Sequence, residues 1–410
     1  MIIRMLMTTN HIGRYLIAAA AVFVLLDRAM ASDAHWTALS ATALIQFAND
    51  IDRHGLDRSR YPIADLEEAV ERADAVAIEL AATDLFGQLA HDLSQGATPE
   101  NHRRAWRIEN AGVGEAAIRE ALDAGLRSGR PEVSLEGLAP PQAAYGALMA
   151  ALAAAPDDEE KYKETLRINM ERWRWMPRDL GAGYLLVNIP AFEAIFVRGG
   201  DELARYRVIA GAKKTPTPQF SALATGVTVN PTWFVPSSIV TESVGALLKN
   251  KPEEAARLGY YIAEDGGVRQ KPGPANALGR LKLAMPNPYS IFIHDTPNRK
   301  IFDKENRALS HGCIRVSDAE DFAAQVLGEP WDGEMIDRLI DAGATATIEL
   351  DMPIPVYVAY FTAMPHGSGE VAVYPDVYGL DRAMMKAEAA PARSTADAVI
   401  AGNCPPEARG

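Results

Sequence analysis

Two short stretches decide the fold and the chemistry of this chain: SIFIHDTP at residues 290–297 and LSHGCIRV at residues 309–316. The first is an apolar run that ends at His294 just before a proline turn, which is typical of a strand. The second places Cys313 directly after Gly312. Together the two stretches carry one thiol and two imidazoles, which is a possible nucleophile with two possible bases.

The residue types around Cys313 indicate acyl transfer. A cysteine has a pKa of about 8.5, and an adjacent imidazole can turn it into a thiolate nucleophile. His294 and His311 are both candidates for that imidazole. Gly312 gives the backbone steric freedom, so the amides of Gly312 and Cys313 could form an oxyanion hole. A nucleophile, a base and an oxyanion hole together favour a thioester mechanism.

Residue types alone leave three other interpretations of Cys313 open. It could be an inert thiol, or it could pair with Cys404, the only other cysteine. Such a bridge needs Cα atoms within about 7 Å, and Cys404 lies in an Ala-, Pro- and Ser-rich terminal stretch. A zinc ion bound by His294, His311 and Cys313 is also chemically reasonable.

The sequence around the two stretches predicts a mostly β region. Residues 183–190, 191–198 and 203–210 are rich in β-branched and aromatic side chains and are separated by turn residues. A polar, charged and partly helical stretch at 241–273 predicts an insertion over one face of the sheet. Further strands are expected at 226–229, 233–235, 289–294, 344–350 and 356–361.

The part of the chain from residue 32 to 169 has a helical pattern. Leu66, Val70, Ala73 and Ala77 recur at steps of three and four residues, and alanine is abundant. The histidines of this part lack a partner at the spacing of metal ligands on a helix. We therefore expect a helical region without a chemical site of its own.

The first thirty-one residues predict a secretory signal peptide. Arg4 and Arg14 precede an apolar run at 15–26, and Ala29-Met30-Ala31 provides an Ala-x-Ala cleavage site after Ala31. The run is shorter than the roughly 20 residues of a membrane-spanning helix. We expect a mature protein without a stable membrane span, in an oxidising compartment.

Length and charge exclude other classes of protein. The 410 residues suggest two or three domains. There are 54 acidic against 41 basic residues, for a formal charge of −13, so a basic nucleic-acid-binding surface is not expected. Two cysteines are too few for a disulfide scaffold or a zinc site of four thiolates.

At residues 294–315 the sequence resembles the L,D-transpeptidases, which share a YkuD-type catalytic domain. The family pattern is a His, a spacer, then Ser or Thr followed by His-Gly-Cys, an apolar residue and Asn or Arg. Here His294 is followed by fifteen residues and then by SHGCIR at 310–315. A motif of this length at this spacing rarely arises by chance.

The wider sequence resembles the large Gram-negative branch of murein L,D-transpeptidases. The segments that carry this resemblance are 168–175, 187–190, 230–233, 294–297 and 355–362. The resemblance implies an α+β fold. In it, an α-helical scaffold domain precedes a mostly β, YkuD-like catalytic domain, a β-sandwich-like mixed sheet with short helices. The implied divisions are a signal peptide at 1–31, the scaffold at 32–165, the catalytic domain at 166–383 with a cap at about 241–273, and a disordered tail at 384–410.

The resemblance also implies a role for each site residue. Cys313 is the nucleophile and His294 the general base, oriented by the backbone carbonyl of Asp295. A Tyr often lies two positions before this His in the branch, but here the residue is Phe292. The expected supporting or substrate-binding residues are Trp233, Ser310, His311 and Arg315.

The implied reaction is 3→3 cross-linking of peptidoglycan without a cofactor or metal. Cys313 would attack a donor tetrapeptide stem and release D-Ala. A diaminopimelate amine of an acceptor stem would then take the acyl group. Carbapenem inhibitors and a periplasmic location are implied as well. The alternatives are 1→3 cross-linking, L,D-carboxypeptidase action, D-amino-acid exchange, and a non-catalytic or zinc-binding cell-wall protein of the same fold.

Overall fold

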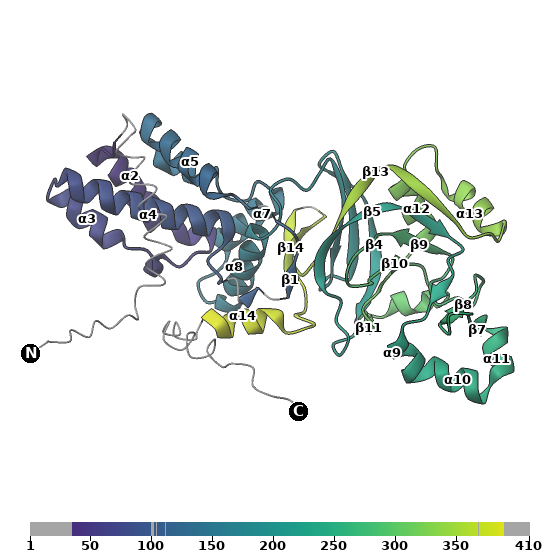
Figure 1. Ribbon diagram of the computed structural model, residues 1–410. Helices are drawn as coiled ribbons and strands as arrows, with labels where there is room; N and C mark the ends of the chain where they lie inside the picture. The colour runs from purple at the N-terminus through teal and green to yellow at the C-terminus, as the bar shows by residue number, and fades with distance from the viewer. Residues whose placement is uncertain (1–34, 100–101, 104, 111, 368, 389–410) are drawn as a thin grey trace, which may run out of the picture.

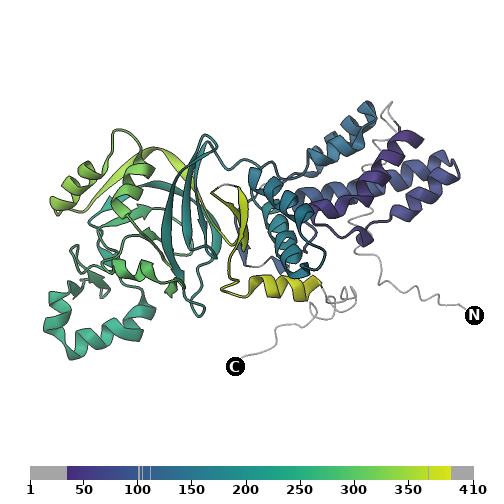
Figure 2. The ribbon, with the colours of Figure 1, turned by 180° about the vertical axis from the view of Figure 1, so that it is seen from behind.

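The computed structural model describes residues 35–99, 102–103, 105–110, 112–367 and 369–388. A helical N-terminal region lies beside a region built on one large sheet (Figures 1 and 2). The predicted signal peptide and Cys404 lie outside the described residues. Across the described ranges, no helix is both long and apolar enough to span a membrane.

The helical region packs around its own apolar core, in which Leu44, Leu85 and Leu89 are fully buried. One helix was expected to run through Ala73, but the chain turns there with a φ of +51°. The Asp74 side chain then accepts the Val76 and Ala77 amides and starts a new helix, because a side-chain cap satisfies the free first-turn donors. The elements, in chain order, are α2 (Ala38–Asn49), η1 (Ile51–His54), η2 (Arg58–Arg60), α3 (Ile63–Glu71), α4 (Ala75–Gln95), β1 (Trp106–Arg107), α5 (Glu115–Ser128), α6 (Pro131–Glu136), α7 (Ala143–Ala154) and α8 (Glu160–Arg174).

The second region contains a ten-stranded mixed sheet that closes on itself. From β5 the pairing runs through β13, β2, β3, β4, β12, β10 and β9, and β9 pairs again with β5. β1 adds to β5, and β11 adds to β4. The strands are β2 (Gly183–Asn188), β3 (Glu193–Arg198), β4 (Asp201–Gly211), β5 (Gln219–Val229), β9 (Leu281–Ala284), β10 (Ile293–His294), β11 (Ala308–Ser310), β12 (Ile314–Val316) and β13 (Ala346–Ala359).

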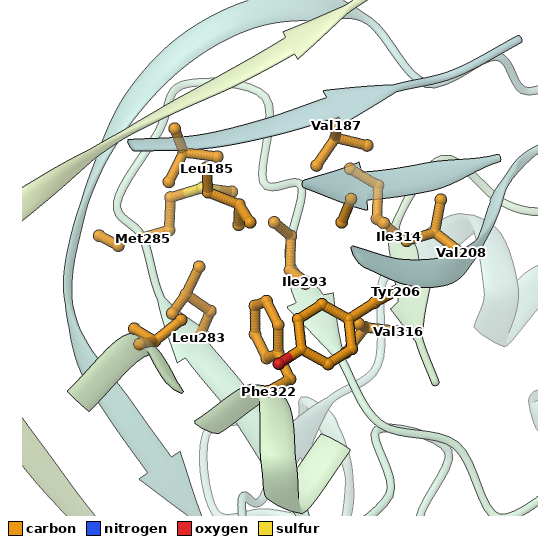
Figure 3. Close-up of a cluster of buried hydrophobic side chains, with 14 of the residues drawn as sticks. Leu185, Val187, Tyr206, Val208, Leu283, Met285, Ile293, Ile314, Val316 and Phe322 are labelled. Atoms are coloured by element: carbon orange, nitrogen blue, oxygen red, sulfur yellow. The ribbon is translucent and has the colours of Figure 1, made fainter. Parts of the chain in front are cut away.

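The inside of the closed sheet is filled by apolar side chains (Figure 3). Ile293, Ile314 and Val316 come from the strands next to Cys313, and all three are at most 1% exposed. The helix α12 (Ala319–Leu327) adds Phe322, whose ring meets Tyr206 edge-on at 5.3 Å. This core fixes the strands that carry the sequence motif.

Several strands differ from the expectations. Most of the residues in the two strands expected at 344–350 and 356–361 belong to one long strand, β13 (Ala346–Ala359), whose register shifts between Glu349 and Ile354. Only the last two residues of the strand expected at 289–294 pair. The Asn287 side chain instead hydrogen-bonds the Ile291 backbone, which holds that part in a turn. The short strand β9 was not expected at all.

Residues 233–270 form an insertion that projects from the sheet region (Figure 1). Its strands form a small sheet in the order β6-β8-β7. The insertion covers most of the predicted cap at 241–273, and its helical content agrees with the prediction. Its elements are β6 (Trp233–Phe234), α9 (Ser237–Ile239), the π-helix η4 (Val240–Val244), α10 (Gly245–Asn250), α11 (Pro252–Arg257), β7 (Tyr260–Ile262) and β8 (Val268–Gln270).

The two regions share a second apolar core between α7, α8 and the outside of the sheet. Trp173 of α8 stacks on Phe361 with ring centroids 4.7 Å apart, which joins the two regions. Helix α8 runs across the division expected between residues 165 and 166. Helix α14 (Leu380–Glu388) likewise extends beyond residue 383, where the tail was expected to begin. The remaining elements are η5 (Arg299–Asp303), α13 (Gly333–Asp341), β14 (Ala363–His366) and β15 (Glu370–Val373).

Candidate active site

The pairing of β10 with β12 brings the two motif stretches together. The strands are parallel, with Ile293 opposite Ile314 and His294 opposite Arg315. Both isoleucines point into the core, and side chains alternate along a strand, so His294 and Cys313 lie on the outer face. The Ile314 amide donates to the Phe292 carbonyl over 2.8 Å, which fixes this register next to Cys313.

His294 is buried and held by its neighbour. The residue is only 5% exposed, and its Nδ1 lies 2.5 Å from the Asp295 carbonyl oxygen. A carbonyl only accepts, so Nδ1 carries the proton and Nε2 is the basic atom of the neutral ring. Burial, and then the positive charge of Arg315, lower the pKa of His294 to about 4. The imidazole is therefore neutral at pH 7 and can accept a proton.

Cys313 is partly buried and forms no disulfide within the described residues. Its Sγ lies 3.8 Å from the Ser290 carbonyl oxygen. Burial raises the pKa of the thiol, while the Phe292 backbone, Arg315 and Lys282 act to lower it. Sγ makes no hydrogen bond to His294, which sits diagonally to it on the same face. Catalytic contacts of this kind often tighten only when substrate binds.

Ser310 holds the loop that carries the thiol. Its Oγ accepts the Gly312 amide over 3.1 Å and donates to the Cys313 carbonyl over 2.5 Å. Thr217 adds a hydrogen bond from its hydroxyl to the Gly312 carbonyl. Gly312 has a φ of +114°, which a side chain would strain. Of the two expected oxyanion donors, the Gly312 amide is thus engaged, whereas the Cys313 amide donates to none of the described residues.

His311 lies beside the thiol in sequence but turns toward the insertion. Its Nε2 is 2.9 Å from Glu242 Oε2 of η4, and both side chains are about half exposed. The expected cap and the motif loop are therefore joined by a side-chain contact. Sequence reasoning missed Glu242, because nothing in the sequence pairs it with a residue 69 positions away.

Asp295 and Trp233 occupy different places. The Asp295 carbonyl holds His294 as the family resemblance implies, while its carboxylate accepts the Arg280 amide over 2.9 Å. Burial raises the pKa of this carboxyl group. Trp233 lies in the small sheet of the insertion, where its ring centre is 6.4 Å from that of Tyr260.

Two cations flank His294 on the outer face. Arg315 is opposite His294 on β12, and Lys282 is opposite it on β9. Arg315 was expected at the site, but Lys282 was not. The alternation Leu281-Lys282-Leu283-Ala284 is the signal that could have revealed this strand.

The zinc interpretation finds no support in the arrangement of the ligands. No group of three or more His, Cys, Asp or Glu side chains in the described residues is placed to hold a metal ion. His311 contacts Glu242, while Nδ1 of His294 is engaged by a backbone carbonyl.

Comparison with known proteins assigns these regions to families. Residues 182–357 match the family described as the L,D-transpeptidase catalytic domain, YkuD, and residues 30–152 match the family described as the scaffold domain. The sheet region thus matches the L,D-transpeptidase catalytic domain of the YkuD family, and the helical region before it matches the scaffold domain. The family expected from the sequence and the α+β fold class are confirmed.

One curated relative and several solved structures are similar to parts of this chain. A Haemophilus influenzae protein named "Putative L,D-transpeptidase" is 32% identical over 251 residues, which cover 56% of this chain and half of that protein. Among solved structures, an L,D-transpeptidase from Mycobacterium smegmatis is 14% identical over 43% of this chain and 58% of its own, with a TM-score of 0.24. An L,D-transpeptidase mutant from Enterococcus faecium is 12% identical over 44% and 52%, with a TM-score of 0.22.

Proposed function

We propose that this protein is a peptidoglycan L,D-transpeptidase that works through a thioester on Cys313. The observation that carries the proposal is the β10–β12 register, which puts Cys313 and His294 on one face of a sheet whose residues match the YkuD domain. A nucleophile and a base on the same face can act on one bound substrate.

The proposed reaction has two acyl-transfer steps. His294 takes the thiol proton as Cys313 Sγ attacks the carbonyl carbon between the L-centre of diaminopimelate and the terminal D-Ala. The C–N bond breaks, and the D-Ala amine leaves with a proton. In the second step an acceptor amine attacks the thioester, His294 takes its proton, and the thiol is restored. The chemistry uses only side chains and backbone of this chain.

The other site residues have supporting roles in this proposal. The Cys313 amide stabilises the oxyanion of each tetrahedral intermediate, since it makes no other hydrogen bond. The Gly312 amide can join it only if Ser310 releases it. Ser310 shapes the loop, and Arg315 is a candidate contact for an anionic substrate group.

The location and partners are part of the proposal. We propose export through a signal peptide cut after Ala31, action on stem peptides in the periplasm, and acylation by carbapenems. An L,D-transpeptidase has been solved in complex with imipenem. The preferred product is a 3→3 cross-link, because the family resemblance favours a tetrapeptide donor and a diaminopimelate amine as acceptor.

Intact-mass spectrometry with purified disaccharide-tetrapeptide tests the function. The mature protein is incubated with the donor, and the products are fragmented. We expect a covalent adduct on Cys313, release of D-Ala and a dimer whose fragments show the 3→3 linkage. Cys313→Ser should abolish turnover, while its melting temperature stays within a few degrees of the wild type.

Each alternative gives a different result in the same experiment. A 1→3 dimer would replace the proposed linkage and keep the enzyme class. A trimmed tripeptide without dimer would indicate carboxypeptidase action. Retained turnover in Cys313→Ser would overturn the mechanism. Bound zinc together with a thiol that resists alkylation would support the non-catalytic alternative.

A further inference from the structure

Lys282, His294 and Arg315 form a row across three neighbouring strands. Lys282 on β9 is opposite His294 on β10, and His294 is opposite Arg315 on β12. Side chains directly opposite each other share a face of the sheet, so the two cations flank the imidazole on the face that carries Cys313. Any substrate carbonyl that reaches Sγ therefore lies beside two positive charges.

These two cations have no acidic partner within the described ranges. Two arginines nearby differ in this respect, since Arg280 and Arg299 both contact the Glu320 carboxylate. The Lys282 ammonium lies 4.8 Å from the centre of the Phe292 ring, which is an aromatic contact and not an ion pair. Arg315 Nε is buried and has no hydrogen-bond partner.

An anion bound between Lys282 and Arg315 would stabilise both charges. Burial lowers the pKa of both Lys282 and Arg315, because a charge removed from water is penalised. A cation that is partly removed from water is stabilised by an opposite charge nearby. The insertion offers one carboxylate near the motif loop, Glu242, but it contacts His311 and neither cation. Both side chains remain partly exposed, so a carboxylate that arrives from solvent can reach them and balance their charge.

We infer that Lys282 and Arg315 bind a carboxylate of the donor stem peptide next to the scissile carbonyl. The inference rests on the proposed transpeptidase function. The donor tetrapeptide has two such groups, the terminal carboxylate of the leaving D-Ala and the free carboxylate of diaminopimelate. Arginine matches a carboxylate with its planar fork, and lysine adds a point charge.

The inference gives the site a preference for the length of its donor. If the leaving residue supplies the carboxylate, a stem one residue longer places a neutral amide at the same position. The two cations would then remain unpaired in the complex, and a site built around polar groups discriminates strongly against a ligand that leaves them unpaired. In that case Lys282 determines which length of donor the site accepts.

Three synthetic donors test this assignment: the tetrapeptide with both carboxylates free, its C-terminal amide, and the form with the diaminopimelate carboxylate amidated. kcat/KM for D-Ala or D-alaninamide release is measured for the wild type, Lys282→Met, Lys282→Arg and Lys161→Met. Lys161→Met is the matched control, since it removes a lysine charge from the exposed surface of α8. We expect the wild type to prefer the free tetrapeptide over one of the amides by about ten-fold or more.

Lys282→Met should reduce that preference to near one, whereas Lys282→Arg and Lys161→Met should retain it. The amide that loses activity in the wild type identifies which carboxylate is bound. Equal use of all three donors by the wild type would overturn the inference and leave the transpeptidase function standing. A Lys282→Met effect equal for all donors, and equal for alkylation by iodoacetamide, would also overturn it and assign Lys282 to the thiol alone. If no donor acylates the wild type, the proposed function itself fails.

Should Lys282→Met fail to fold, the donor preferences of the wild type and of Lys282→Arg still test whether the site binds a carboxylate. The melting temperature of each variant is measured alongside the kinetics. A preference ratio of one in a folded wild type is sufficient to reject the carboxylate site.

Discussion

At the scale of single residues, the site combines a buried, neutral base with a thiol whose pKa is raised. Burial lowers the pKa of His294 to about 4 and raises that of Cys313. Both shifts favour the uncharged pair over a thiolate–imidazolium pair. The thiol is therefore expected to lose its proton during attack on the substrate, with His294 as the acceptor.

The pH dependence of stability tests the environment of His294. Its folded pKa of about 4 lies below the unfolded value of 6.5, so the unfolded state binds more protons between these values. The contribution of His294 is complete above pH 6.5 and is lost as the pH falls toward 4, by up to about 3 kcal/mol. His294→Asn should flatten the stability curve over this window in urea titrations. A slope of stability against pH in His294→Asn equal to that of the wild type would contradict the assignment.

Ser310 gives a second prediction for a single side chain. Its hydroxyl joins the Gly312 amide to the Cys313 carbonyl, and the residue is only 3% exposed. Ser310→Ala leaves both backbone groups without their partner, which costs about 1–3 kcal/mol. We expect lower thermal stability and slower acylation of Cys313 by a carbapenem, measured by intact mass. Acylation at the wild-type rate in a destabilised variant would restrict Ser310 to folding.

At the scale of elements, strand pairing makes neighbours of residues that the sequence motif does not connect. The motif predicted Cys313, His294 and their supporting residues from sequence order alone. Lys282 lies twelve positions before His294, and only the β9–β10 register makes them neighbours. Likewise, the contact of His311 with Glu242 depends on where the insertion folds. Local patterns report strands and helices, whereas register and tertiary docking depend on contacts between distant residues.

The contact between η4 and the motif loop is expected to hold the insertion in place. Because both side chains are half exposed, the pair adds at most about 1 kcal/mol to global stability. Glu242→Ala should therefore leave the melting temperature nearly unchanged but increase hydrogen exchange in residues 237–250. Glu264→Ala removes an exposed carboxylate elsewhere in the insertion and is the matched control. Unchanged exchange in Glu242→Ala would show that other contacts hold η4.

At the scale of the whole molecule, the scaffold and the closed sheet are joined through α8 and α14. The Asn169 side chain hydrogen-bonds the backbone and hydroxyl of Thr362. Arg172 of α8 forms a buried ion pair of 2.7 Å with Asp381 of α14, and Asp381 also accepts the Thr362 hydroxyl. The expected division at residue 165 cuts through this helix. Sequence composition marks where the strands begin, but it does not show that α8 packs against both regions.

The Arg172–Asp381 pair predicts how strongly the two regions depend on each other. Asp381→Asn leaves the Arg172 guanidinium buried without its countercharge, which costs about 3–5 kcal/mol. Replacing both partners, with Arg172→Met and Asp381→Asn together, removes the isolated charge and should recover part of that loss. Unfolding is followed by calorimetry on the mature chain, where a junction this well packed should give one transition in the wild type. If Asp381→Asn instead melts at the wild-type temperature, the buried pair is not what couples the scaffold to the catalytic domain.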